Sequence, residues 1–282
     1  MFFGIPEKWT KIMLGSQSPK TEHKFNNTKG LAFHKDRLIV CDKGNNIVQI
    51  LNQEYARENV LGSFSGRFAK PFQPQSVAVS QDNLYFILDD SNLQIVVCDQ
   101  RNEISSIITL PHDTKPWCIA LVKTYVLVTD VNGHRLLMYS LDGQYIAKVG
   151  SQHGRSQFSY PYFVAVNSQD AIMVSDSFNH CIKCFDIDLK YKYKYGSLGK
   201  GDGQLRWARD IDLDQDDNVY LCDSENDRIV KWSSDGKWIC NLFKRDISHP
   251  QYIAVTATGD RIAIGWGGNE IAVFSKVPDP PT

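Results

Sequence analysis

A pattern that recurs every 41–47 residues runs through most of this 282-residue chain. Each copy has a short apolar stretch, a polar turn, a second apolar stretch that ends in Asp, an Asn-bearing turn, and a third stretch that opens with Ile or Leu. The aspartates of the five clear copies are Asp42, Asp89, Asp130, Asp176 and Asp223. Periods of this length are typical of propellers, in which each repeat forms one antiparallel sheet.

The Asp and Asn residues of the repeat are interpreted as turn residues rather than as catalytic groups. Short side chains of this kind accept hydrogen bonds from nearby backbone amides. We therefore expect each Asp to bond to the amides of the turn that follows it. A sixth copy, from Gln251 to Phe274, has Gly265 in place of the Asp, so its turn must be held differently.

The repeats are out of phase with the ends of the chain. Residues 9–16 resemble 145–151 and 192–197, which are the fourth and outermost strands of two later repeats. The last repeat, conversely, stops after its third strand at Phe274. The simplest arrangement lets the N-terminal strand complete the last sheet, which removes the free edges that an open ring would expose.

These observations predict an all-β fold: a six-bladed β-propeller whose last blade combines one N-terminal and three C-terminal strands. We expect one domain over residues 9–276, with residues 1–8 and 277–282 as terminal extensions.

Two of the repeats also carry a family resemblance. Residues 174–182 (Val-Ser-Asp-Ser-Phe-Asn-His-Cys-Ile) and 221–229 (Leu-Cys-Asp-Ser-Glu-Asn-Asp-Arg-Ile) resemble the Asp-Ser-x-Asn-His/Arg-x-Ile core of NHL repeats. A chain of six such blades is most similar to the C-terminal domains of tripartite-motif NHL (TRIM-NHL) proteins. The resemblance implies a binding domain: some members bind RNA, and others bind protein partners for ubiquitin transfer by an N-terminal ligase portion that is absent from this sequence.

Composition and charge limit the partners and the cellular compartment that we expect. The formal net charge is -1, so a polyanionic partner needs a local patch rather than overall basicity. The seven cysteines are interpreted as small buried hydrophobes of a reducing compartment. Because the chain has no continuous apolar run of 18 residues, we expect a cytoplasmic protein without a membrane span.

Charge also differs between the two faces of the predicted ring. The loops between blades and the second-to-third turns share one face, and the other turns lie opposite. The loops between blades sum to a positive charge, so their face is the less acidic one. The residue that precedes each innermost strand should surround the channel on this face. These six residues are Lys29, Gln75, Trp117, Tyr162, Arg209 and Gln251.

Cations interleaved with aromatic rings suit single-stranded RNA, because cations pair with phosphates and rings stack on unpaired bases. The predicted phosphate contacts are Lys29, Lys70, Lys115, Arg155, Arg206 and Arg209. The predicted base contacts are Trp117, Tyr160, Tyr162 and Tyr252. We expect no DNA partner. The alternatives are that some of these rings, such as Phe72 and Trp207, pack between blades, and that the same face presents a protein client to an attached ubiquitin ligase.

Enzymatic functions fit less well. Calcium would need carboxylates at the channel, and the six positions above hold none; Asp210 is one residue away. Zinc would need converging ligands, and His23, His112, His153 and His249 lie at unequal depths in their loops. We therefore expect a non-catalytic domain without metal or cofactor.

Overall fold

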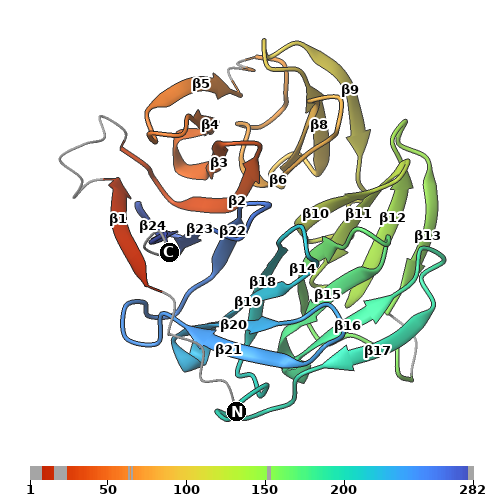
Figure 1. Ribbon diagram of the computed structural model, residues 1–282. Helices are drawn as coiled ribbons and strands as arrows, with labels where there is room; N and C mark the ends of the chain where they lie inside the picture. Colours follow the sequence, from red (N-terminus) through yellow and green to blue (C-terminus); the bar gives the residue numbers. More distant parts are fainter. Residues whose placement is uncertain (1–7, 16–23, 63, 65, 151–153, 279–282) are drawn as a thin grey trace.

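The computed structural model describes residues 8–15, 24–62, 64, 66–150 and 154–278. The described chain forms six four-stranded antiparallel sheets arranged in a ring (Figure 1). The prediction of an all-β, six-bladed propeller is confirmed. Most of the expected extensions, residues 1–7 and 279–282, lies outside the described residues.

The innermost strand of each blade lines the axis. The six inner strands are β2 (Thr28–His34), β6 (Pro74–Val79), β10 (Pro116–Val122), β14 (Pro161–Val166), β18 (Ala208–Leu213) and β22 (Tyr252–Val255). In five of them the pairing with the second strand shifts register just after the first residue, as at Thr28/Leu31 and Pro161/Val164. Such bulges turn side chains away from the regular pleat, and they fall at the positions that the sequence assigns to the channel.

The two middle strands of each blade form the buried part of the sheet. The second strands are β3 (Arg37–Asp42), β7 (Tyr85–Asp89), β11 (Tyr125–Asp130), β15 (Ile172–Asp176), β19 (Val219–Asp223) and β23 (Arg261–Gly265). The third strands are β4 (Ile47–Leu51), β8 (Gln94–Cys98), β12 (Arg135–Ser140), β16 (Cys181–Phe185), β20 (Arg228–Trp232) and β24 (Glu270–Lys276). Every residue of β7, β8, β15 and β16 is buried, because both faces of these strands pack against neighbouring blades.

The outer strands face solvent and close the ring. They are β5 (Arg57–Leu61), β9 (Ile104–Thr109), β13 (Tyr145–Val149), β17 (Tyr191–Tyr195), β21 (Trp238–Leu242) and β1 (Trp9–Gly15). β1 pairs with β24 from Trp9↔Lys276 to Gly15↔Glu270, and in Figure 1 β1 lies beside β24. Leu14, only 3% exposed, anchors β1 in the core. The last blade therefore combines one N-terminal and three C-terminal strands, as expected from the out-of-phase repeats.

The repeat aspartates join each blade to the loop that leads into it. Asp42 is fully buried; its Oδ1 accepts a hydrogen bond from the Asn26 amide (2.8 Å) and its Oδ2 from Asn45 Nδ2 (2.8 Å). The other four aspartates likewise accept the amide of a residue 15–17 positions upstream. The expectation of bonds to the following turn's amides is thus wrong for Asp42, because the turn is held through the Asn side chain instead; Asp130 does accept the Gly133 amide.

Three of these turns are 3₁₀-helical: η1 (Lys43–Asn45), η2 (Ser177–Asn179) and η3 (Ser224–Asn226). Among the described residues no helix has the length and apolar character needed to cross a bilayer. All seven cysteines lie in the described part of the chain, none of them forms a disulfide, and six of them are buried.

A cavity of about 460 Å³ follows the axis between the inner strands. Small and apolar residues such as Ala32, Ala120 and Val164 line most of it. Gln75, one of the predicted channel positions, also lines it, as does Asp210, which follows Arg209 in the sequence. The fold therefore places those positions at one end of the channel.

Candidate functional site

The six aligned positions come together at one end of the channel, called here the channel mouth: Lys29, Gln75, Trp117, Tyr162, Arg209 and Gln251. The contacts cross the blade boundaries. The Trp117 and Tyr162 rings meet edge to face, with centroids 4.9 Å apart, and the Arg209 guanidinium lies 4.4 Å from the Tyr162 ring centroid. Lys29 Nζ lies 5.8 Å from the ring centroid of Tyr252, the neighbour of Gln251. Residues from five of the six blades thus take part in these contacts.

Arg209 is held by rings rather than by a carboxylate. Its guanidinium lies between Tyr162 and Trp207, whose ring centroid is 5.2 Å away. Burial lowers the pKa of Arg209, but an arginine remains charged at any physiological pH. Cation–π contacts stabilise this charge without neutralising it. The guanidinium therefore remains able to pair with an anion.

A second cationic group lies on the opposite side of the mouth. Lys43 Nζ donates to Asp90 Oδ2 (2.6 Å) and to Gln75 Oε1 (3.0 Å). Burial, followed by the charges of Lys43 and Arg209, lowers the pKa of Lys29, and Asp90 opposes this shift. Within the described residues, Asp90 is the one carboxylate that acts on Lys29, and it is already paired with Lys43. The mouth is locally positive although the chain as a whole is not.

An aromatic row continues from the mouth over blades three to five and consists of His134, Tyr160, Phe178 and Trp207. Successive ring centroids lie 4.7, 4.5 and 5.1 Å apart. Phe178 is 46% exposed and Tyr160 36%, so both present ring surface to solvent. Because Trp207 contacts Arg209, the row and the mouth form one continuous surface.

Local hydrogen bonds fix the turn that carries Phe178. The Phe178 amide donates to Ser159 O (3.2 Å) and the Ser177 amide to Tyr160 O (3.3 Å). The Ser177 hydroxyl donates to Ala208 O on the next blade. The hydrogen-bonded turn, rather than burial of the ring, therefore directs the Phe178 side chain toward solvent.

Sequence reasoning missed Phe178, although a signal was present. It occupies the variable position of the Asp-Ser-x-Asn turn, where the other copies have Gly44, Ser91, Asn132 and Glu225. An aromatic residue at a polar turn position does not contribute to the core, so it is a candidate for contact with a ligand.

Two histidines orient the aromatic row. Tyr160 and Trp207 have left-handed backbone conformations, with φ of 56° and 63°. Their amides donate to Nδ1 of His134 (3.0 Å) and of His180 (3.2 Å). A ring nitrogen that accepts carries no hydrogen, so a neutral ring has its hydrogen on Nε2. Each histidine thus retains one donor for a ligand.

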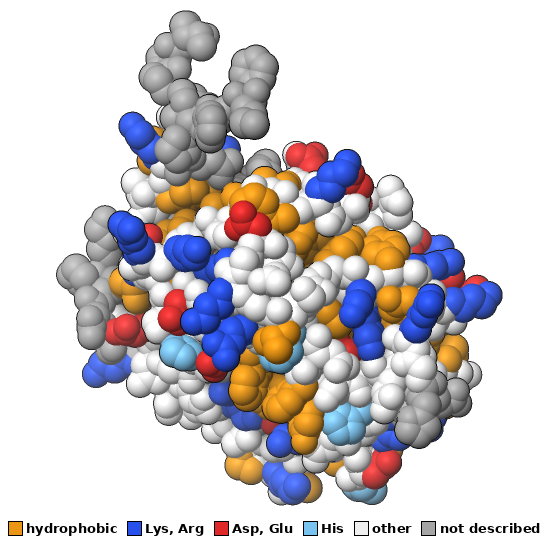
Figure 2. All heavy atoms as spheres, turned by 90° about the horizontal axis from the view of Figure 1, so that it is seen from below, with side chains coloured by type: hydrophobic (Ala, Val, Ile, Leu, Met, Phe, Trp, Pro, Cys, Tyr) orange, Lys and Arg blue, Asp and Glu red, His pale blue; other side chains and the backbone are white. Residues whose placement is uncertain are grey.

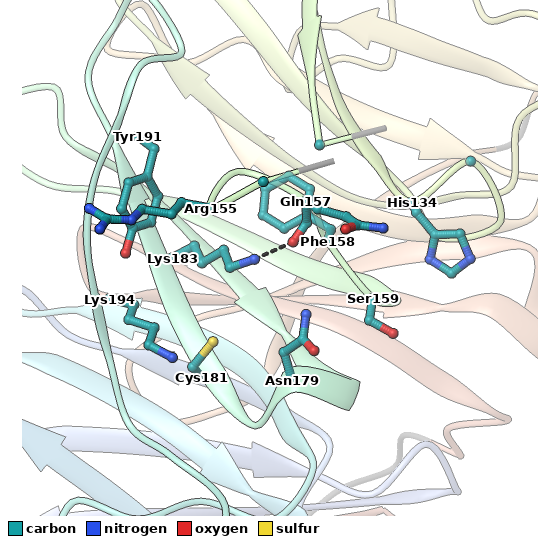
Figure 3. A pocket seen from close by; sticks show the side chains of 13 residues that line it. His134, Arg155, Gln157, Phe158, Ser159, Asn179, Cys181, Lys183, Tyr191 and Lys194 are labelled. Atoms are coloured by element: carbon teal, nitrogen blue, oxygen red, sulfur yellow. Dashed lines mark hydrogen bonds between the residues drawn. The ribbon is translucent and has the colours of Figure 1, made fainter. Parts of the chain in front are cut away.

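A side cleft of about 1010 Å³ lies beside the row, between blades three and four. Figure 3 shows His134 and Ser159 at one end and Arg155, Tyr191 and Lys194 at the other. Lys183 in its floor is already engaged, because it pairs with Asp176 (2.8 Å) and donates to Gln157 O. Arg155 and Lys194 are exposed. The structure thus places Arg155 in this cleft and not at the channel mouth.

Three other predicted phosphate contacts, Lys70, Lys115 and Arg206, are exposed, and within the described residues their side chains form no hydrogen bond or ion pair with the channel mouth. Their backbone amides are fixed by the turn of their own blade; those of Lys115 and Arg206 donate to the repeat aspartates Asp130 and Asp223. Lys70 lines a separate pocket of about 520 Å³ between the first two blades.

The prediction that Tyr252 contacts a base is wrong. Its side chain is 1% exposed, and its ring packs edge to face against Phe163, with centroids 5.7 Å apart. A base cannot stack on a ring that is covered in this way. The Tyr252 ring instead forms a cation–π contact with Lys29. Trp207, for which interblade packing was the alternative, is half-buried and belongs to the aromatic row; Phe72 is buried and packs against Phe64.

Charges of both signs are mixed on one face of the molecule. On the face seen in Figure 2, Lys and Arg side chains lie among hydrophobic and uncharged ones, with scattered Asp and Glu. Within the described residues, no group of three His, Cys, Asp or Glu side chains is arranged to hold a metal ion. His23 and His153 lie outside the described residues.

Comparison with known families and proteins gives partial matches. The NHL repeat family model matches residues 158–185, the segment that holds Tyr160, Tyr162 and Phe178. Among curated proteins, Protein brain tumor from Drosophila melanogaster is 26% identical over 122 residues, which is 43% of this chain and 12% of that protein. The chain therefore corresponds to a small part of this relative.

Solved structures share the fold over nearly the whole chain. A virginiamycin B lyase from Staphylococcus aureus has a TM-score of 0.68 at 12% identity, covering 96% of this chain and 100% of its own. A protein of unknown function from Bacteroides thetaiotaomicron has a TM-score of 0.72 at 12% identity, covering 96% and 77%. At such identity the likeness concerns the fold alone.

Proposed function

Because the chain is a six-bladed β-propeller of the NHL-repeat type, we propose that it binds single-stranded RNA across the channel mouth and the aromatic row. The role would be that of a non-catalytic platform in post-transcriptional regulation, in the cytoplasm. The observation that carries the proposal is the continuity between Arg209, which lacks an ion-pair partner among the described residues, and the exposed rings of Phe178 and Tyr160.

The geometry suits unpaired nucleotides. Exposed ring faces offer stacking surface to bases of any sequence, and cations beside them meet the phosphates. Arg209 lies at one end of the aromatic row, and Arg155 lies in the side cleft beyond His134 at the other. A short strand that crossed this surface would meet a cation, two exposed rings and a second cation in turn.

The histidine donors add a means of reading bases. Nε2 of His134 and of His180 can donate to a carbonyl or ring nitrogen on a base edge. Such edges are free when a base is unpaired. We therefore expect a mild base preference rather than fully sequence-independent binding.

A protein client is the second candidate, and the near-neutral formal net charge of -1 favours it. The exposed Phe178 and Tyr160 could seat the apolar side chains of a peptide segment. In that case the propeller would present clients to an attached ubiquitin ligase, as the TRIM-NHL resemblance implies. Salt separates the two candidates, because a peptide held by rings releases few counterions.

The test is fluorescence anisotropy with a labelled random-sequence RNA of about 12 nucleotides, over a salt series from about 50 to 200 mM. We expect saturable binding at about 100 mM salt and a log–log slope near -2, since about three phosphates on Lys29, Arg209 and Arg155 release about 0.7 ions each. If no saturable RNA binding is observed, the RNA proposal fails and the same surface is assigned to a protein client.

A further inference from the structure

The channel mouth contains an unusual excess of hydrogen-bond donors. Gln75 is 2% exposed and Tyr252 1%. Gln75 Nε2, the Tyr252 hydroxyl, Arg209 Nε and Trp117 Nε1 are all buried atoms without a hydrogen-bond partner among the described residues. A buried donor that stays unpaired costs about 1–3 kcal/mol, so four at one place indicate a missing acceptor.

The orientation of Gln75 follows from its neighbour. Its Oε1 accepts from Lys43 Nζ (3.0 Å), which leaves the Nε2 donors for the channel. Gln75 adjoins the Tyr252 hydroxyl. Even if Nε2 turned toward that oxygen, the phenolic hydrogen would still need an acceptor. The pair therefore offers donors in either arrangement.

The charges at the channel mouth also indicate an anionic ligand. Lys29, Lys43 and Arg209 act on one another, and Asp90 is the single carboxylate among the groups acting on Lys29. It is already paired with Lys43. Lys29 and Arg209 are thus left without an ion-pair partner among the described residues.

A buried carboxyl group, Asp210, lines the channel next to the mouth. Asp210 follows Arg209, and its carboxyl oxygens accept from the Ile211 amide (2.9 Å) and the Ile253 amide (3.1 Å). Burial raises the pKa of Asp210 well above its usual range, which favours the uncharged form of this carboxyl group.

We propose that the channel mouth binds a phosphate monoester group, with Lys29 and Arg209 as its cations and Gln75, Tyr252 and Trp117 as neutral donors. Its dianionic charge matches the two unpaired cations, and three terminal oxygens can use this many donors, whereas a carboxylate has two oxygens and one charge. The group is either free phosphate or, resting on the proposed function, the terminal phosphate of a bound RNA strand.

A strand end fits the recess better than an internal phosphate. An internal phosphodiester carries one negative charge and two chain directions, both of which would have to leave a recess whose inner donors are almost fully buried. A terminal phosphate has one chain direction. From the axis, that chain can follow Arg209 and Trp207 onto the aromatic row.

The experiment compares eight-nucleotide RNAs of one sequence with a 5′-phosphate, a 3′-phosphate or free hydroxyl ends, at constant ionic strength. Inorganic phosphate, with acetate as the carboxylate control, is tested by thermal unfolding of the full chain. Gln75→Glu places a carboxylate in the site while keeping an acceptor for Lys43. Tyr252→Phe removes one donor and keeps the ring below Lys29. Lys190→Glu on the opposite face is the charge control.

We expect one phosphorylated end to tighten binding about 10-fold, as two or three additional hydrogen bonds would. We expect Tyr252→Phe to reduce that preference several-fold and Gln75→Glu to abolish it, whereas Lys190→Glu leaves it intact. Inorganic phosphate should stabilise the wild type and not Gln75→Glu, and acetate should stabilise neither.

The possible failures are distinguishable. RNA that binds equally with and without a terminal phosphate, together with equal phosphate effects in wild type and both variants, would overturn this proposal and leave RNA binding intact. Phosphate stabilisation that depends on Gln75 and Tyr252, with no RNA binding, would support the phosphate site with free phosphate as its source and reject the RNA function.

Discussion

The guanidinium of Arg209 lies 4.4 Å from the ring centroid of Tyr162, on the neighbouring blade. The two residues hold the same position in two successive repeats, and a β-bulge follows the start of each strand. The ring symmetry of the fold thus converts residues 47 positions apart in the sequence into neighbours at one opening. A cation stacked on a ring in this way is available to a ligand, because its hydrogen-bond donors are not used by a carboxylate.

Ring closure by β1 predicts an asymmetry between two of its residues. Leu14→Ala should cost about 2–5 kcal/mol, because it removes a buried side chain that joins the first strand to the core. Ile12→Ala, whose side chain is 37% exposed, should change the free energy of unfolding by less than about 0.5 kcal/mol. Urea unfolding measures both. Equal losses would contradict the closure described here.

The repeat aspartates should be structural. Asp223 Oδ2 accepts from Arg228 Nε (2.8 Å), and Arg228 is 1% exposed. Asp223→Ala leaves that charge buried and unpaired, so we expect a loss of about 3–5 kcal/mol. In the exposed pair Lys190–Asp188, Asp188→Ala should cost less than about 1 kcal/mol. Chemical unfolding of both variants would show whether burial sets the difference; a small effect for Asp223→Ala would refute it.

Asp212 in the channel should make stability depend on pH. Burial raises its pKa to about 7, against about 3.9 in an unfolded chain. Between these values the folded state binds the extra proton, so this group's contribution falls as pH rises from about 4 to 7 and levels off above. The stability of Asp212→Asn relative to wild type should therefore increase over that window. Unfolding at several pH values checks this, and a constant difference would contradict the raised pKa.

The sequence predicted the ring well because the repeat is periodic. Five aspartates at regular spacing and an outermost strand without a preceding blade were enough to infer six blades and their closure. The same alignment found Lys29, Trp117, Tyr162 and Arg209, because symmetry places aligned residues at equivalent points. Such inferences need no knowledge of side-chain packing.

Positions outside the alignment were harder to predict. Tyr252 is adjacent to an aligned position, yet the next residue of a strand points elsewhere, and its ring is buried against Phe163. Phe178 was missed since its turn was assigned a purely structural role. Arg155 lies in a loop between blades, and the direction of its side chain depends on contacts in the side cleft. In each case tertiary packing decides the direction of the side chain.

The aromatic row predicts that ring surface contributes to binding. Phe178→Ala should weaken RNA binding by about 1–3 kcal/mol, the cost of losing one stacked base, with little effect on unfolding because the residue is 46% exposed and lies outside the core. Tyr145→Ala removes an equally exposed ring from the outer strand β13 and should leave affinity unchanged. Anisotropy titrations compare the two, and equal effects would argue against a localised stacking surface.

The most direct test reverses the charges at the channel mouth. RNA affinity is measured for Lys29→Glu with Arg209→Glu and for Lys190→Glu with Lys237→Glu, which makes the same change in net charge on the opposite face. The account predicts that the first pair weakens binding about 100-fold or more, since each lost charged contact costs about 1.5–3 kcal/mol. The second pair should bind nearly as well as the wild type, with thermal unfolding unchanged in both. Equal weakening by the two pairs, or none by the first, would contradict the assignment of this face as the RNA-binding surface.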